Sequence, residues 1–325
     1  MSEAQSAGTA PFDRRAIPSE ASESRWSAAD GHALRRIDWP APETAPRGSI
    51  LFFPGRGDAY EKYLETLDHW HRHGWAVTAA DWRGQAGSGR LGKDAVTGHI
   101  ADFSVWIDDL AAFWAEWKQD RPGPHVLIGH SMGGHLVLRA LAERRVDPDA
   151  LVLSAPMLGF LNSGIPAAVM HLAARLMCLL GDRRRPAWKW SEKPGELPEG
   201  RMELLTHDYD RYGDEVFWRT ARPELAMGPG SWGWVERGYA STRAMDRPGV
   251  LEAVQTPVFI VATSNDKLVA PQAIVRAENR LPHGEALIFG DEAHHEILRE
   301  ADPVRDRALA AIDLFLARVV APAQG

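Results

Sequence analysis

A serine between glycines gives the strongest chemical signal in the sequence. It lies in Gly129-His130-Ser131-Met132-Gly133-Gly134, directly after a strand-like apolar run and directly before a helical pattern. This is the pattern G-x-S-x-G in the strand, turn and helix context that it requires. A side chain at Gly129 or Gly133 would collide with the neighbouring strand and helix, and the tight turn presents the serine hydroxyl at a sheet edge. We therefore predict that Ser131 is a nucleophile.

A serine hydroxyl needs a histidine base held by a carboxylate, here in the chain order Ser, Asp, His. Asp266 lies in the loop after the apolar run 257–262 and is the candidate acid, with Asp291 as its substitute. Two adjacent histidines, His294 and His295, follow the apolar run 286–289. The residue types alone leave the choice between these two histidines open.

Two backbone N–H groups are expected to stabilise the oxyanion of such a reaction. One is that of Met132, because it opens a helix whose dipole points at the developing negative charge. The other is expected from the loop after an early strand. That loop contains Gly55-Arg56-Gly57, which favours the N–H of Arg56; the alternative is a plain glycine turn.

Alternating strand and helix patterns must position these residues. Short apolar runs bounded by Gly, Pro or Asp predict strands at 49–53, 75–80, 125–129, 150–154, 257–262 and 286–289. Helical patterns occupy 60–73, 103–118, 132–144, 271–280 and 303–319. The alternation predicts an α/β fold with a mostly parallel sheet and helices on both faces.

The stretch 158–247 interrupts this alternation and shows no convincing strand. We expect a helical insertion at the strand ends, which acts as a lid, with Trp232 and Trp234 lining the substrate pocket. The predicted organisation is a flexible tail at 1–23, a first core part at 24–157, the lid at 158–247 and a second core part at 248–320.

The composition describes an ordinary globular protein and excludes several classes of function. The chain has 325 residues, a net charge of -7 and 45% hydrophobic residues, and this acidic balance argues against nucleic acid as a partner. Cys178 is the only cysteine, so a reducing, cytoplasmic location is expected. The first residues do not resemble a secretory signal, and no run is long enough to cross a bilayer.

The apolar run 165–180 is followed by Arg183-Arg184-Arg185. This combination is compatible with peripheral contact at the inner membrane surface while a substrate enters. The alternative is a lid helix that packs over the pocket with its basic end in water.

Together these residues resemble the α/β-hydrolase superfamily, and within it the lysophospholipase L2-like and monoacylglycerol lipase branch with a serine aminopeptidase S33-type domain. The similarity covers nearly the whole chain after about Arg25. Further matching segments are Pro54-Gly55-Arg56 with Glu61-Lys62-Tyr63, Asp81-Trp82-Arg83-Gly84-Gln85 with Ser88 and Arg90, Gly98-His99-Ile100 with Phe103, Leu205-Thr206-His207-Asp208 with Arg211-Tyr212, Trp232-Gly233-Trp234, and His295-Glu296-Ile297-Leu298 with Glu300.

The resemblance implies hydrolysis of esters of single-chain lipids through an acyl-enzyme, without a cofactor and with no protein partner. It also selects His295 over His294, because the family's triad histidine is the first residue of the segment H-E-I-L-x-E. Two residues depart from the wider pattern. Ala86 replaces a usual glycine, and Pro54 replaces the histidine of the H-G motif, although lysophospholipase L2-like sequences share this proline.

Two other functions and a metal site are alternatives to this interpretation. An aminopeptidase would need a lid carboxylate to hold the substrate ammonium, with Glu203, Asp208 and Glu215 as candidates. A non-catalytic ligand sensor would usually have a damaged triad. His69 and His73 share a spacing that suits a metal, but the sequence suggests no third ligand, so no metal site is expected.

Overall fold

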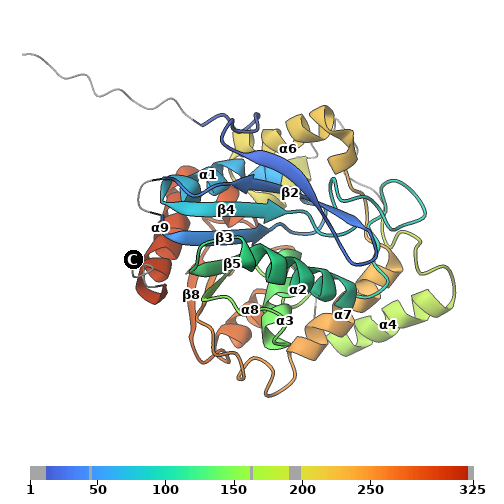
Figure 1. The fold of residues 1–325 in the computed structure, drawn as a ribbon. Helices are drawn as coiled ribbons and strands as arrows, with labels where there is room; N and C mark the ends of the chain where they lie inside the picture. The colour runs from blue at the N-terminus through green and yellow to red at the C-terminus, as the bar shows by residue number, and fades with distance from the viewer. Residues whose placement is uncertain (1–11, 44–45, 162–163, 190–198, 321–325) are drawn as a thin grey trace, which may run out of the picture.

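The computed structural model describes residues 12–43, 46–161, 164–189 and 199–320. Within them, eight strands form one sheet in the order β1-β2-β4-β3-β5-β6-β7-β8 (Figure 1). The strands are β1 (Ser22–Ser27), β2 (Ala33–Trp39), β3 (Gly48–Phe53), β4 (Trp75–Ala80), β5 (His125–His130), β6 (Ala150–Ser154), β7 (Val258–Thr263) and β8 (Gly284–Phe289). Strands β4, β3, β5, β6, β7 and β8 run parallel, whereas β2 pairs antiparallel with β4 and β1 pairs antiparallel with β2.

All six predicted strands are present, but the antiparallel hairpin of β1 and β2 was not predicted. Its sequence is too polar to read as a strand, because β1 is mostly exposed and β2 carries Arg35 and Asp38. Both of these side chains are buried and paired, Arg35 with Glu61 and Asp81, and Asp38 with Arg36 and Arg121. Strand β2 is therefore buried although it contains charged residues, because these residues form ion pairs with distant parts of the chain. Its sequence alone does not indicate a buried strand.

The structure also differs from the flexible tail predicted for residues 1–23. Strand β1 begins at Ser22, and the preceding residues contact helix α6 (Tyr209–Ala221). Arg14 and Arg15 both pair with Asp214, and the indole of Trp218 donates to the carbonyl of Arg14. Residues 1–11 of the predicted tail lie outside the described part of the chain.

Helices cover both faces of the sheet, because successive strand residues point to opposite sides. Leu51, Leu127 and Leu153 pack in one apolar layer, whereas Phe52, Val126 and Val152 pack in the other. The first layer is closed by α2 (Ser104–Gln119), α3 (Met132–Ala142) and α8 (Pro271–Glu278), and the second by α1 (Leu64–Arg72) and α9 (Asp302–Val319). The predicted fold class is therefore confirmed.

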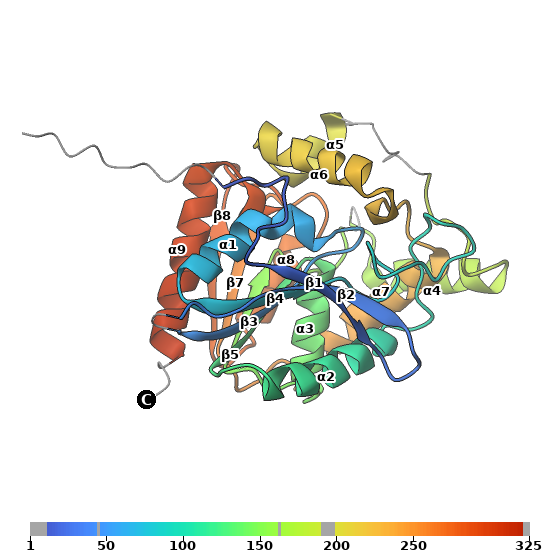
Figure 2. The same cartoon turned by 45° about the horizontal axis from the view of Figure 1, so that its top comes forward.

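The chain between β6 and β7 forms helices that cap one end of the sheet (Figure 2). They are α4 (Ala167–Leu179), α5 (Glu199–Leu205), α6 (Tyr209–Ala221) and α7 (Trp232–Met245), with the 3-10 turn η2 (Pro223–Leu225). Helix α4 packs against α7, whereas α6 packs against the turn η1 (Tyr60–Tyr63) that precedes α1. We refer to the described residues between β6 and β7, which include the helices α4 to α7, as the cap.

The loops after β3, β5, β7 and β8 meet beneath this cap, since the carboxyl ends of parallel strands share one edge of the sheet. These four loops carry Arg56, Ser131, Asp266 and His295.

Among the described residues, no helix is both long enough and apolar enough to span a bilayer.

Candidate active site

Ser131 lies in a strained turn between β5 and α3. Its φ is 52° and its ψ is -118°, a backbone conformation that residues other than glycine rarely adopt. The turn needs glycines on both sides: a Cβ at Gly129 would lie 2.7 Å from the backbone of Gly133, and one at Gly133 would lie 2.4 Å from the carbonyl oxygen of Pro54. The two glycines therefore let the turn pack directly on the loop after β3 that contains Arg56. We call this loop the oxyanion loop.

Three predicted side chains form one hydrogen-bonded chain. The Ser131 hydroxyl lies 2.9 Å from Nε2 of His295, and Nδ1 of the same imidazole lies 2.7 Å from Oδ2 of Asp266. The other carboxylate oxygen of Asp266 accepts the N–H groups of Leu268 and Val269, at 2.8 and 3.0 Å. The carboxylate is therefore fixed on one side and presents its free oxygen to the imidazole.

The environment of His295 prepares it to accept a proton. Burial lowers the pKa of His295, but the charge and hydrogen bond of Asp266 raise it more, so that the pKa lies above its ordinary value of 6.5. Burial likewise raises the pKa of Asp266, and the charge and hydrogen bond of His295 outweigh it, so that this pKa is lowered. The pair thus favours a carboxylate beside a basic imidazole.

The two alternative residues lie apart from this chain. The ring of His294 stacks on that of His207, with 3.8 Å between the ring centroids, and its backbone N–H donates to Glu300 at 2.7 Å. Asp291 accepts a hydrogen bond from the side chain of Asn265. The structure therefore brings His295 and Asp266 to Ser131, and not His294 or Asp291.

The loop after β3 lies directly against the nucleophile. A Cβ at Gly55 would be 3.1 Å from the Cβ of Ser131, so the loop reaches the reacting hydroxyl at close range. Gly57, at φ 66°, donates its N–H to the side chain of Gln85 at 2.9 Å. That the N–H groups of Arg56 and Met132 supply the oxyanion donors stays a prediction.

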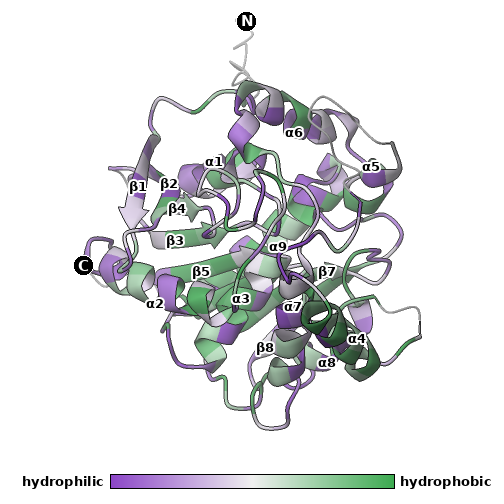
Figure 3. Ribbon diagram, turned by 90° about the vertical axis from the view of Figure 1, so that its right-hand side faces the viewer, coloured by the Kyte–Doolittle hydropathy of each residue, from purple (hydrophilic) through white to green (hydrophobic). Residues whose placement is uncertain are grey.

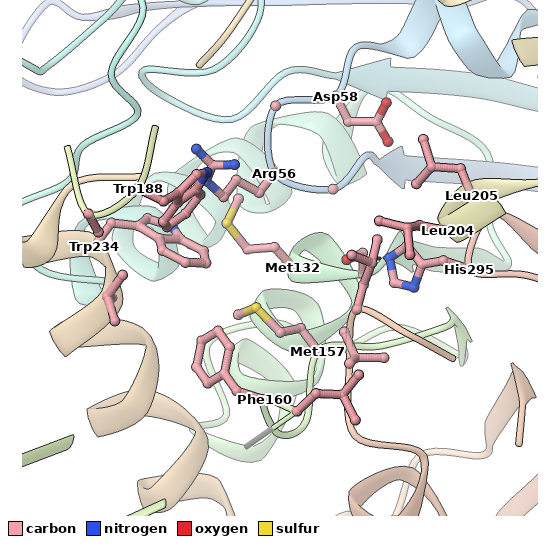
Figure 4. A pocket seen from close by; sticks show the side chains of 18 of the residues that line it. Arg56, Asp58, Met132, Met157, Phe160, Trp188, Leu204, Leu205, Trp234 and His295 are labelled. Carbon is pink, nitrogen blue, oxygen red and sulfur yellow. Dashed lines mark hydrogen bonds between the residues drawn. The ribbon is translucent and has the colours of Figure 1, made fainter. Parts of the chain in front are cut away.

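A cavity of about 770 Å³ opens in front of Ser131, between the sheet edge and the cap (Figure 4). Its walls include Met132, Met157, Phe160, Trp188, Trp234 and Tyr239, together with Met170, Ala173 and Ala174 from α4. Trp232 lines it as well, so both tryptophans that the sequence assigned to a pocket reach the cavity. Sequence reasoning missed Met157 and Phe160, because single apolar residues after a strand carry no distinguishing pattern.

One end of the cavity is ionic. Lys62 lies within 3.0 Å of carboxylates from Asp58, Glu215 and Glu296, and we call these four residues the Lys62 cluster. Burial lowers the pKa of Lys62, but the three carboxylates raise it more, so that the ammonium stays charged. Lys62 and Glu296 were noted in the sequence only as parts of matching segments, without a role of their own.

Two groups of side chains among the described residues have the composition of a metal site. His69 lies 2.8 Å from Asp313 of α9, with His73 nearby, and His207 lies 3.0 Å from Glu300, with His294 nearby. The sequence suggested no third ligand for His69 and His73, because Asp313 is distant along the chain. Both carboxylates already accept imidazole hydrogen bonds, so the present contacts are explained without an ion.

Comparisons with known proteins agree with this geometry. Residues 44–302 match the family described as serine aminopeptidase, S33. The chain is 28% identical over 286 residues to "Lysophospholipase L2" of Escherichia coli K12, covering 84% of this chain and 81% of that protein. It is 28% identical over 280 residues to "Phospholipase YtpA" of Bacillus subtilis, covering 85% and 98%.

A solved structure of a monoglyceride lipase from Saccharomyces cerevisiae has the same fold. The TM-score is 0.74 at 17% identity, and the match covers 95% of this chain and 98% of that one. The family match spans most of the chain, including every candidate site residue. The chain belongs to the serine aminopeptidase S33 family of the α/β-hydrolase superfamily.

Proposed function

We propose that the protein is a serine hydrolase that cleaves carboxylic esters of single-chain lipids through an acyl-enzyme. The observation that carries this proposal is the chain of hydrogen bonds from Ser131 through His295 to Asp266 at the floor of a largely apolar cavity. The names of its relatives, which include lysophospholipase, phospholipase and monoacylglycerol lipase, support the same substrate class.

The reaction follows from the geometry. Ser131 attacks the ester carbonyl while His295 accepts its proton and then delivers it to the leaving alcohol. Asp266 holds the Nδ1–H tautomer and stabilises the imidazolium, and the N–H groups of Arg56 and Met132 stabilise the oxyanion. Water then attacks the acyl-enzyme by the same route. The apolar walls suit the acyl chain, and the Lys62 cluster beside His295 suits a polar leaving alcohol.

The arrangement of carboxylates favours an ester over an aminoacyl amide. Glu215 is paired with Lys62 and Arg219, Asp208 caps α6 and pairs with Arg211, and Glu203 is exposed outside the cavity lining. The carboxylates among the described lining residues, Asp58 and Glu296, are both bound by Lys62. A substrate ammonium would therefore have to displace an existing ion pair.

The first experiment compares p-nitrophenyl esters of increasing acyl length, using the wild-type protein beside Ser131→Ala. We expect activity that peaks at medium or long chains, and a loss of at least ~10³-fold in kcat in the variant, because no other group replaces the nucleophile. Activity on a lysophospholipid and on a monoacylglycerol is then compared. Wild-type turnover by Ser131→Ala, or a preference for an aminoacyl amide, would contradict the proposal.

We also propose that α4 places the protein on a lipid surface at the cytoplasmic face of the membrane. The outer face of α4 and the residue after it expose Val169, Leu172, Leu176, Leu179 and Leu180, each more than half accessible. Spacings of three and four residues put them on one side of the helix, and Figure 3 shows α4 coloured mostly as hydrophobic. The inner face of the same helix lines the cavity, so a lipid leaving the surface meets the pocket at once.

Charge near α4 supports an anionic surface as the partner. Arg175 is exposed on the helix, and Arg183 and Arg184 follow it with about half of each side chain accessible. These cations lie beside the apolar stripe, although the whole chain is acidic. The lone cysteine, Cys178, agrees with a reducing compartment.

Co-sedimentation with vesicles of phosphatidylcholine and phosphatidylglycerol tests this contact. Changing Leu172, Leu176 and Leu179 together to serine should weaken binding at least about tenfold, because each buried leucine contributes about 2 kcal/mol. Leu314→Ser is the matched control, since this leucine is 72% exposed on α9 and away from the cap. Binding that survives both the leucine changes and replacement of Arg183, Arg184 and Arg185 would exclude the surface role.

A further inference from the structure

The side chain of Arg56 contacts two tryptophans of the cap, whose indole rings also contact each other edge to face. Its guanidinium carbon lies 4.9 Å from the ring centroid of Trp188 and 5.1 Å from that of Trp234. Nη2 donates to the carbonyl oxygen of Gly228 at 2.6 Å. Figure 4 shows the guanidinium beside both indole rings, at the opposite end of the cavity from His295. The residue proposed to supply an oxyanion donor from its backbone thus has its side chain in the cap.

The partners of Arg56 belong to two segments of the cap. Gly228 and Trp234 flank the start of α7, which is fixed to the core because Gly98 exchanges backbone hydrogen bonds with Pro229 and Ser231. Trp188 belongs to residues 183–188, which we call the strap and which follow α4. The strap contacts the same stretch through Ala187 N–H to Gly230 at 2.8 Å and Gly233 N–H to Arg183 at 2.7 Å.

The two tryptophans differ in how firmly they are held. Trp234 is 5% exposed within α7, whereas Trp188 is 43% exposed at the end of the strap. A displacement of the strap that breaks its backbone hydrogen bonds to Gly230 and Gly233 would withdraw Trp188 from Arg56 while Trp234 stays within α7. The guanidinium would then keep one aromatic partner instead of two, which weakens its fixation.

We propose that Arg56 is a positioning residue that links the cap to the oxyanion hole. Its side chain, held in place by its contacts with Trp188 and Trp234, keeps its own backbone N–H directed at the oxyanion beside Ser131. This inference rests on the proposed function, because it assigns a role in stabilising that reaction's intermediate. The loop needs such fixation, since glycines on both sides of Arg56 allow its peptide groups to rotate. When the strap is bound to α7 and Trp188 contacts Arg56, the N–H of Arg56 is in place before the ester carbonyl of the substrate binds.

Replacing the side chain tests the inference, because the backbone N–H itself is kept. Arg56→Met should lower kcat about 10- to 100-fold on a short, soluble ester with little change in KM, since a misplaced donor costs much of what a deleted donor costs. The Ki of an alkyl trifluoromethyl ketone should rise by a similar factor. This inhibitor accepts the Ser131 oxygen at its carbonyl carbon, and the resulting oxyanion occupies the same position.

Arg90→Met is the matched control. Arg90 also binds carbonyl oxygens of the cap, those of Glu224 and Ala226 at 2.8 and 2.7 Å, but it does not belong to the oxyanion loop. We expect its kcat and inhibitor Ki to stay within about threefold of wild type. Trp188→Ala removes the aromatic contact from the cap side and should reproduce part of the Arg56→Met effect. Trp188→Phe keeps an aromatic ring and should retain most of the wild-type kcat and inhibitor Ki.

The outcomes separate the two proposals. If wild-type hydrolysis does not depend on Ser131, the proposed function fails. If it does depend on Ser131 but Arg56→Met and Trp188→Ala leave kcat and the inhibitor Ki unchanged, the positioning role alone fails. A change confined to KM would also overturn it, because Arg56 would then bind substrate in the ground state. Should Arg56→Met not fold, Trp188→Ala decides the same question with the arginine intact.

Discussion

Asp266 and His295 define the chemistry at the scale of single residues. Each is buried, and each shifts the pKa of the other towards the charged form, so burial alone does not determine either protonation state. A neutral His295 is required to accept the proton of Ser131, and the raised pKa means that it becomes protonated at a higher pH than an ordinary histidine. Activity must therefore fall as the pH is lowered through a value above 6.5.

The pH profile of kcat/KM should show this acidic limb with a midpoint above 6.5. Asp266→Asn should move the midpoint to lower pH, because the charge that raises the pKa of His295 is removed. It should also lower kcat roughly 10⁴-fold, because the asparagine no longer holds the Nδ1–H tautomer. Asp291→Asn serves as the control and should leave the profile unchanged. An acidic limb below pH 6 in the wild type would contradict the assignment.

Gly133 is a second position where one residue decides the local geometry. A Cβ there would lie 2.4 Å from the carbonyl oxygen of Pro54 and 2.7 Å from that of Phe53. Gly133→Ala should therefore destabilise the fold by at least about 2 kcal/mol, since two backbone segments must move apart. Gly200→Ala, in α5, meets no atom within 4 Å and should be neutral or stabilising. Urea unfolding curves of the two variants would measure the difference.

At the scale of elements, the Lys62 cluster joins parts of the chain that lie far apart. Lys62 in η1 contacts Asp58 in the oxyanion loop, Glu215 in α6 and Glu296 in the histidine loop. The α5 helix adds backbone contacts, because Leu204 and Leu205 accept the N–H groups of His295 and Glu296. The α5–α6 half of the cap is thus attached to the loops that hold the candidate oxyanion donor and base.

Lys62→Met should leave three carboxylates without their common cation. Because the side chain of Lys62 is only 5% exposed, we expect a loss of about 3–5 kcal/mol in the free energy of unfolding. Lys93→Met breaks an ion pair with Asp182 whose lysine is 53% exposed and should cost less than about 1 kcal/mol. Equal stability of both variants in denaturant titrations would show that the cluster does not hold the cap.

At the scale of the whole molecule, the cap has two halves that are attached very differently. Helix α6 buries Arg211, Tyr212, Asp214, Glu215, Trp218 and Arg219. Helix α4 buries only Ala174 among its residues and packs mainly on α7. Contacts of this kind determine how easily a segment opens, so α4 is the part of the cap that can move while α6 remains in place.

Hydrogen exchange followed by mass spectrometry should resolve the two halves. We expect amides of α4 to exchange substantially faster than those of α6, because so little of α4 is buried. Adding anionic vesicles should slow exchange in α4 and leave α6 unchanged. Equal protection of both helices without vesicles would show that the cap opens as one body.

The parallel sheet and the site loops could be predicted from the sequence because apolar runs and turn residues are local signals. Ser131 and Asp266 have the same origin, since each follows a recognisable strand, whereas the choice of His295 over His294 required the resemblance to a family. Strands β1 and β2, the partner of His69 and the Lys62 cluster could not be predicted in this way. Each depends on polar or charged residues that pair with residues distant along the chain, and a linear pattern does not record such contacts.

The weak attachment of α4 has a consequence for protein engineering. The helix contributes Met170, Ala173 and Ala174 to the cavity wall, yet it shares few buried contacts with the core. Exchanging it for the corresponding helix of a relative would alter the shape of the acyl compartment without disturbing the triad or the sheet. The preferred acyl-chain length of the substrate could then be changed by replacing helix α4 alone. A series of variants with different α4 helices could be built on the same sheet and triad.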